Sequence, residues 1–324
     1  MTGSTKAAKI RRFLLREGWL APINTVSFLA AGEYNENYLV RSNTDSYVFR
    51  INHGSQLGLD NQIEYEFMVL KAVEPSLVTP KAHHFRAAPN TLNAGVLLMD
   101  YMAGRKFEYQ IDWQKAAIVF ANIHLLPANA DLIVQANPVQ DIAQESFRLI
   151  NAFDNHPLKH QKRILLEYFA KITAMAPKAQ ALFSNECMCV VNTEVNSGNF
   201  IVERDRAFLV DWEKAVISNR YQDLGHFLVS TTTLWKSDYR FSEVEKRQFL
   251  SMYRDAAHID IGLDELYEKT RLLEKTILLR AMSWCYMAYY EYTNTQRQLS
   301  NVDTFSKIKK YMDEIDSFLD ISLN

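Results

Sequence analysis

The hydrophobic pattern of this chain changes period near residue 103, and this change limits the fold more than any other feature of the sequence. Before it, short runs rich in β-branched and aromatic residues are separated by turn-forming segments, which is typical of antiparallel strands. After it, apolar residues recur every three or four positions, which is typical of amphipathic helices. The pattern predicts an α+β chain with two unequal lobes, residues 1–102 and 103–324, and a ligand cleft between them.

The first lobe is predicted to be a five-stranded antiparallel sheet with one inserted helix. An amphipathic helix over 5–17, stopped by Gly18, precedes the sheet. The inserted helix covers about 60–74 and is ended by Pro75. The five strands are expected at 26–31, 37–41, 47–52, 81–86 and 95–101.

Helices predominate in the second lobe. They are expected over 112–126, 140–153, 158–174, 221–235, 242–257, 263–293 and 303–319. A short island of strand-like runs, at 188–191 and within 199–212, interrupts them and predicts a small β hairpin inside the helical lobe.

The composition excludes several classes of protein. The 324 residues include 36 Lys and Arg against 38 Asp and Glu, a formal net charge of −2, so no overall electrostatic argument favours nucleic acid or an anionic membrane as partner. Three cysteines are too few for a disulfide framework and lack the partners of a zinc site, which indicates reduced thiols. No run of 18 or more apolar residues and no signal-peptide core occurs. We therefore expect a cytoplasmic protein with a small-molecule ligand.

Polar residues cluster where the runs of the island meet. Glu194 follows the first run, Asn199 stands five residues later, and Asp211 stands twelve residues after Asn199. Phosphoryl transfer needs oxygen ligands for a divalent metal and an acidic group beside the attacking hydroxyl. A loop with a carboxylate and a carboxamide, facing a second carboxylate across a hairpin, supplies these groups.

This segment resembles the catalytic segment of the aminoglycoside phosphotransferase and choline kinase family, relatives of the protein kinases. The family pattern is His-Gly-Asp, four residues, Asn, and then an Asp followed by Trp or Phe. The resemblance implies a protein-kinase-like bilobal fold, ATP and Mg²⁺ as cofactors, and transfer of the γ-phosphoryl group to a hydroxyl. It makes Glu194, Asn199 and Asp211 the catalytic residues, of which Asn199 and Asp211 hold the metal.

The catalytic triplet departs from the family pattern, because this chain has Asn192-Thr193-Glu194 in place of His-Gly-Asp. Glu is one methylene longer than Asp, and a misplacement of about 1 Å can reduce a rate about a hundredfold. Two hypotheses follow: an active kinase, or a degenerate nucleotide-binding relative that acts as a sensor or scaffold.

The first lobe matches the same family at separate positions. Gly32 and Asn35 lie in a turn that resembles the nucleotide loop, whose backbone N–H groups approach phosphate. Arg50 stands in a strand where the family has a Lys or Arg that reaches the ATP phosphates. Glu66, on the inserted helix, occupies the position of its ion-pair partner, whereas the neighbouring Glu64 is interpreted as a solvated charge.

Residues 96–104 resemble the hinge between the two lobes of the family. The resemblance implies that backbone groups around Asp100, Tyr101 and Met102 bind adenine, while Gly104 lets the chain turn.

Two residues of the second lobe are interpreted as structural supports. His124, on an apolar helix, is expected to pack in the core. Asp223 matches the family aspartate that braces the catalytic loop from a following helix.

The acceptor is expected to be an amino alcohol, a sugar or an aminoglycoside-like molecule, as the family implies. Tyr286, Tyr289 and Tyr290 share a helix face that could bind a cationic amine, although packing of these rings in the core is the favoured interpretation. Glu213 and Glu291 are candidate charges for such an amine. A protein substrate is disfavoured, because no Asp-Phe-Gly or Ala-Pro-Glu landmark follows Asp211.

Overall fold

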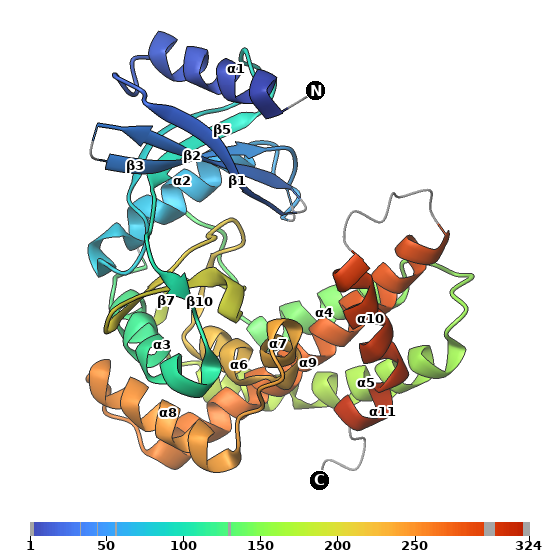
Figure 1. Cartoon of the computed structure of the whole chain (residues 1–324). Coiled ribbons are helices and arrows are strands. Elements are labelled where there is room, and N and C mark those ends of the chain that lie inside the picture. The colour runs from blue at the N-terminus through green and yellow to red at the C-terminus, as the bar shows by residue number, and fades with distance from the viewer. Residues whose placement is uncertain are drawn as a thin grey trace.

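The computed structural model describes residues 3–32, 34–43, 45–55, 57–128, 131–294 and 302–319. It confirms the predicted architecture, an antiparallel five-stranded sheet followed by a mainly helical lobe (Figure 1). Glu33 and Thr44, in two predicted turns of the first lobe, lie outside the described residues.

The sheet of the first lobe has the order β1-β2-β3-β5-β4, and every neighbouring pair is antiparallel. Each strand overlaps a predicted run, with ends that differ by at most two residues. The strands are β1 (Thr25–Ala31), β2 (Asn35–Ser42), β3 (Asp45–Asn52), β4 (Ala82–Arg86) and β5 (Gly95–Asp100).

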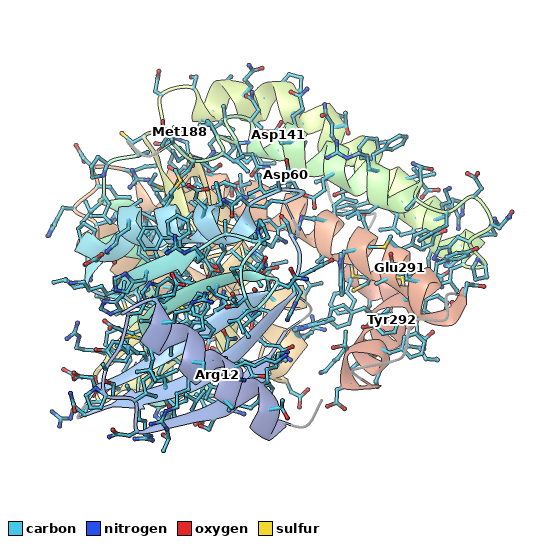
Figure 2. All side chains as sticks on the ribbon, turned by 90° about the horizontal axis from the view of Figure 1, so that it is seen from above. Arg12, Asp60, Asp141, Met188, Glu291 and Tyr292 are labelled. Atoms are coloured by element: carbon cyan, nitrogen blue, oxygen red, sulfur yellow. The ribbon has the colours of Figure 1, made fainter. Side chains whose placement is uncertain are left out.

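Helices cover both faces of this sheet. On β3, Phe49 and Ile51 belong to the apolar cluster under α1 (Gly3–Arg16). Figure 2, seen from above, shows α1, which carries Arg12, lying across the strands. Because successive side chains of a strand point to opposite faces, Arg50 faces the other side, where α2 (Gln62–Val73) packs. A short 3-10 turn over Glu74–Ser76, which contains Pro75, ends α2 as expected.

The second lobe is built around the long helix α9, which packs against α4, α5, α6, α8 and α10. Aromatic rings of Phe120, Phe200, Phe227 and Phe249 form the centre of its core. The helices are α3 (Tyr109–His124), α4 (Pro138–Ile150), α5 (Lys159–Phe183), α6 (Tyr221–Leu228), α7 (Ser230–Lys236), α8 (Glu243–Ala256), α9 (Leu263–Asn294), α10 (Val302–Asp313) and α11 (Ile315–Phe318).

Three of the predicted helices were wrong in extent. The helix predicted over 221–235 is two helices, because Val229 is extended, with φ −67° and ψ 137°. The helix predicted over 303–319 is also two, α10 and α11, separated at Glu314. The helix predicted to end at 174 continues to Phe183 and contains Pro177.

The strand-like island of the second lobe, predicted to be a single hairpin, is divided between two small sheets. β8 (Phe200–Glu203) and β9 (Arg206–Leu209) do form a hairpin, which β6 (Arg105–Lys106) extends. In contrast, β7 (Met188–Val191) pairs with β10 (Val216–Asn219), a strand that was not predicted. This arrangement places residues 192–199 and the segment after β9 at the base of the first lobe.

Within the described ranges, no helix has both the length and the apolar character that crossing a membrane requires. The three cysteines are unpaired, with Cys189 and Cys285 buried and Cys187 exposed.

Candidate active site

Arg50 is the basic residue that the sheet places between the lobes. It is 5% exposed, and its Nη1 forms an ion pair with Glu66 of α2, as predicted. The same nitrogen donates to Asp211 Oδ1 at 3.0 Å, and Nε donates to Asn37 Oδ1 at 3.0 Å. Burial raises the pKa of Glu66, although Arg50 opposes this shift. The pair therefore joins the sheet, α2 and the second lobe at one point.

A buried aspartate holds the loop formed by residues 192–199. Asp223 of α6 accepts hydrogen bonds from the backbone N–H groups of Asn192 at 2.8 Å and Thr193 at 2.9 Å, so it braces the loop as predicted. His124 Nε2 lies 3.3 Å from the same carboxylate, and burial lowers the pKa of His124. This buried histidine is a structural support, as expected.

Hydrogen bonds within the loop fix the direction of Glu194. Asn192 Oδ1 accepts from the Glu194 N–H at 3.0 Å, and Asn199 Nδ2 donates to the Glu194 carbonyl oxygen at 2.7 Å. The Glu194 carboxylate then lies 3.1 Å from Lys214 Nζ. Asn192 thus takes over a bracing role at the first position of the triplet, and Asn199 lies at the end of the loop.

A left-handed backbone turns the chain at Asp211. Its φ is 66°, a conformation that Asp adopts more readily than most residues. The next residue, Trp212, is fully buried and donates from Nε1 to the Leu209 carbonyl oxygen at 3.1 Å. Asn192 Nδ2 donates to the Asp211 carbonyl oxygen at 2.8 Å. These contacts hold the Asp211 carboxylate toward Arg50.

Three carboxylates come together at the mouth of the cleft, from Glu194, Asp211 and Glu213. One oxygen of each lies within 4.8 Å of the others. Burial, and then the nearby charge of Asp211, raises the pKa of Glu213 to about 7. Clustered carboxylate oxygens are the ligands that Mg²⁺ prefers, so this donor set fits a divalent cation.

The predicted nucleotide loop is attached to this cluster through Asn35. Asn35 Nδ2 donates to Glu213 Oε2, and its Oδ1 accepts from Asn52 Nδ2 at 2.9 Å. The Gly32 N–H donates to the Asn35 carbonyl oxygen at 2.9 Å, which closes the turn. A Cβ on Gly32 would have no neighbour within 4 Å, so the backbone there is open to a ligand.

A cavity of about 140 Å³, the hinge cavity, lies between the sheet and the second lobe. Its lining includes six of the predicted nucleotide or metal residues, namely Arg50, Glu66, Asp100, Tyr101, Met102 and Asp211. The N–H groups of Asp100 and Tyr101 donate to the carbonyl oxygens of Lys81 and Ser46. The Met102 N–H has no hydrogen bond to the described part of the chain, which leaves it for a ligand.

A second cavity of about 320 Å³, the acid cavity, lies on the other side of Asp211 and contains all three carboxylates. Gly32 also lines it, as do Lys214, Arg280, Trp235 and Trp284. Asp211 thus separates a space beside the hinge from a space beside Glu194.

The tyrosines of α9 lie outside both cavities and pack against other rings, as favoured from the sequence. Tyr286 stacks on His156, Tyr290 stacks on Phe153, and Tyr289 lies 6.0 Å from Phe305. Glu291 follows them near the end of α9, to the side of the first lobe (Figure 2).

The structure adds three residues whose positions the sequence did not indicate. Thr193 adopts a left-handed backbone, with φ 66°, inside the loop. Lys214 pairs with Glu194, and Arg280 reaches the acid cavity from α9. A charged residue in the apolar stretch after Leu279 is the one signal that could have marked Arg280.

A β lobe, a hinge, a helical lobe and a carboxylate cluster between them define the class of kinase-like phosphotransferases. Residues 25–273 match the model of the phosphotransferase enzyme family, and the chain belongs to this family. No curated protein sequence matches it significantly.

Solved structures of low sequence identity share the whole fold. Choline kinase LicA from Streptococcus pneumoniae is 17% identical, with a TM-score of 0.64 and coverage of 96% of this chain and 100% of that one. A choline/ethanolamine kinase family protein from Mesorhizobium loti is 15% identical, with a TM-score of 0.63 and 99% coverage of each chain. Spectinomycin phosphotransferase, in complex with ADP and spectinomycin, is 14% identical, with a TM-score of 0.60 and 97% coverage of each chain.

Proposed function

We propose that this protein transfers the γ-phosphoryl group of ATP to a hydroxyl group of a small molecule. The observation that supports the proposal is that Asp211 lines both cavities, so a nucleotide in the hinge cavity and an acceptor in the acid cavity would meet at its carboxylate. An amino alcohol, a sugar or an aminoglycoside-like molecule is the acceptor that the family resemblance implies.

ATP would be bound by backbone N–H groups and by the charged side chain of Arg50. The Met102 N–H would bind adenine, and the backbone of Gly32 would approach phosphate. Arg50 uses Nη1 and Nε for its protein partners, while Nη2 has no hydrogen bond to a described residue and is left for phosphate. Glu66 keeps the guanidinium in this orientation.

Asp211, with Glu213 and the predicted ligand Asn199, would hold the cation. A divalent cation held by these residues would supply positive charge that offsets the negative charge of the phosphates. Asp211 is fixed by its backbone turn and by Asn192, so it needs no rearrangement to act as a ligand.

On the acceptor side, Glu194 would orient the hydroxyl group. Its Oε1 faces Lys214, and its Oε2 has no hydrogen bond to a described residue. As the acceptor oxygen bonds to the γ-phosphorus, the bond to the bridging oxygen breaks and ADP leaves with that electron pair. Oε2 takes the hydroxyl proton.

The Lys214 contact supports the second hypothesis, a degenerate kinase that binds nucleotide without transfer. Lys214 Nζ lies 3.1 Å from Glu194 Oε1, so it occupies one of the two carboxylate oxygens that an acceptor hydroxyl could reach. Turnover distinguishes this hypothesis from an active kinase, because both predict binding of Mg²⁺-ATP.

The test compares Asp211→Asn and Glu194→Gln with the wild type. Mg²⁺-ATP at about 100 times its Kd should stabilise the wild type by about 2.7 kcal/mol, and Asp211→Asn should lose most of this effect. Glu194→Gln should keep the stabilisation and abolish phosphorylation in a screen of amino alcohols, sugars and aminoglycosides. Glu203→Gln, at an exposed strand end outside both cavities, is the matched control. Equal stabilisation of Asp211→Asn and wild type would refute the metal assignment.

A further inference from the structure

The acid cavity is lined by basic as well as acidic side chains. Beyond Glu194, Asp211 and Glu213, the charged residues that line it within the described chain are Lys214 and Arg280. Lys214 is paired with Glu194 in this cavity, whereas Glu145, the partner of Arg280, does not line it. A divalent cation would offset the charge of Asp211 and Glu213, which leaves Arg280 as the charged group of the cavity without an acid partner among its described lining residues.

The two Nη groups of Arg280 can donate hydrogen bonds to a ligand in this cavity. Arg280 Nε lies 3.0 Å from both carboxylate oxygens of Glu145, but the two Nη groups make no hydrogen bond to the described residues. The side chain is about a quarter exposed, at 23%. An Arg guanidinium offers a planar pair of N–H donors that matches a carboxylate or a phosphate.

A third cavity of about 300 Å³, the basic cavity, lies next to the acid cavity and shares the lining residues Lys214, His226 and Arg280 with it. Its charged lining is Arg148, Lys214 and Arg280 against the single carboxylate of Glu145. Arg148 is exposed and forms no ion pair with a described residue. Cations therefore outnumber acids by three to one in this cavity.

His226 lines both of these cavities and adds no positive charge to them. Burial, and then the positive charge of Arg280, lower the pKa of His226 to about 3, while Asp223 opposes this shift. The imidazole is therefore neutral at pH 7 and offers a hydrogen bond at the wall between the two cavities.

We propose that the acceptor is a hydroxy compound with an acidic group, a carboxylate or a phosphate, and that Arg280 and Lys214 bind this group. The inference rests on the proposed function and narrows its substrate class, because a cationic amine would meet the guanidinium of Arg280 in place of a counter-ion. Trp235 and Trp284, whose rings lie 5.9 Å apart at the same cavity, supply the apolar wall for the carbon frame.

The experiment uses molecules that share a carbon frame and differ in charge. On the three-carbon frame, 3-amino-1,2-propanediol, glycerol, glycerate and glycerol 3-phosphate form one series, and glucose, gluconate and glucose 6-phosphate form a second. Binding to the whole protein with Mg²⁺-ADP is measured by calorimetry, and phosphoryl transfer from ATP is measured separately. An acidic member of a series should bind at least about tenfold more tightly than its neutral parent, with the amine weakest. The two acidic forms of each frame distinguish a carboxylate from a phosphate.

Arg280→Gln should remove this preference and leave the binding of Mg²⁺-ATP unchanged. Arg280→Gln alone leaves the Glu145 carboxylate without its ion-pair partner. In the double variant Arg280→Gln with Glu145→Gln both side chains are neutral, and the preference for acidic compounds should be lost there too. Arg163→Gln, an exposed ion-pair residue on α5, is the control. The inference is overturned if no acidic member binds better than its neutral parent, or if the preference survives in the double variant. Transfer to neutral or cationic acceptors alone would overturn this inference while the proposed function stands. Binding of the acidic compounds through Arg280 without any transfer would support Arg280 as their binding site and would count against the proposed function.

Discussion

Thr193 is held in a backbone conformation that its side chain disfavours. Its φ of 66° lies in the left-handed region, where a β-branched residue is a rare outlier. The Asp223 carboxylate binds its N–H, and its Oγ1 donates to the Lys214 carbonyl oxygen at 2.9 Å. The surrounding loop therefore imposes the strain. The related pattern of the family has Gly at this position, which adopts such a backbone without a penalty.

We predict that Thr193→Gly is more stable than Thr193→Ala by about 1 kcal/mol. Both variants lose the hydroxyl hydrogen bond, but only Ala keeps a Cβ that clashes in the left-handed region, at about 1–2 kcal/mol per residue. Urea unfolding measures the difference. At Thr173, exposed within α5, the order should reverse, with Ala about 1 kcal/mol more stable than Gly. The same order at both positions would contradict the strain at Thr193.

What the sequence could predict at this scale was local. The family resemblance marked Arg50 on its strand and Glu66 on the helix as an ion pair, which the structure has, and the spacing from Glu194 to Asp211 marked the loop. It did not predict that Lys214 would pair with Glu194. That contact depends on how the two small sheets sit together, which no local pattern encodes.

At the scale of elements, the hinge depends on a close approach of two backbones. A Cβ on Gly104 would lie 2.5 Å from the Val202 carbonyl oxygen on β8. Gly104 is thus required because the chain passes against β8, rather than because of its own φ angle.

Gly104→Ala should destabilise the protein by about 1–3 kcal/mol, since one of the two backbones must move. It should also weaken Mg²⁺-ATP binding, because residues 100–102 of the hinge cavity are on the same segment. Thermal unfolding with and without nucleotide measures both effects. Gly262→Ala, where a Cβ meets nothing within 4 Å, should stay within about 0.5 kcal/mol of wild type. A neutral Gly104→Ala would refute the close approach.

The buried carboxylate of Asp112 stabilises the start of α3. Asp112 is fully buried and accepts two hydrogen bonds from Arg105 of β6, at 2.6 and 2.8 Å. It also accepts from Lys115 Nζ and the Glu108 N–H. Burial alone would raise the pKa of Asp112, but these donors outweigh it and lower the pKa to about 2.

Asp112→Asn should therefore reduce stability at pH 7 by about 2 kcal/mol, from a pKa near 3.9 in the unfolded chain and about 2 in the folded one. A depressed acid stabilises above its unfolded pKa, so the difference from wild type should stay constant from pH 7 to about 5. It should shrink as the pH falls from about 4 toward 2. Urea unfolding at pH 7, 5 and 3 tests this, with exposed Asp131→Asn as control. A difference that does not change with pH would contradict the assignment.

Element boundaries that the sequence missed depend on distant partners. The strand β10 has four residues and pairs with β7, 25 or more positions earlier, so its own pattern is too short to identify it. The apolar residues of α6 and α7 keep helical spacing across Val229, where one extended residue turns the chain. The apolar pattern therefore does not show that the helix is broken there. The five strands of the first lobe, which form four antiparallel pairs, were predictable because each strand has six or more residues or adjoins a clear turn.

At the scale of the whole molecule, the helix α2 belongs to one lobe by sequence and to both by contact. Gln62 Nε2 donates to the Glu213 carbonyl oxygen at 2.8 Å. Tyr65 OH donates to the Ala215 carbonyl oxygen at 2.7 Å and accepts from the Ile133 N–H at 3.2 Å. Both side chains precede Glu66 on the same helix, so they fix the position from which Glu66 holds Arg50. The lobes are thereby joined in the arrangement that the proposed ATP site needs.

Tyr65→Phe should loosen this connection without touching either cavity, because the ring remains and only the hydroxyl is lost. The buried Ala215 oxygen and Ile133 N–H would lose their partner, at about 1–3 kcal/mol. If the joined arrangement then becomes a minor fraction of the folded molecules, the apparent Kd for Mg²⁺-ATP rises by the inverse of that fraction, and we expect about three- to tenfold. Tyr239→Phe removes a hydroxyl that donates to Glu245 at 2.8 Å within the helical lobe, and should cost stability without changing this Kd. Calorimetric titration of both variants separates the two effects, and an unchanged Kd in Tyr65→Phe would show that Arg50 and Glu66 keep their positions without the α2 contacts.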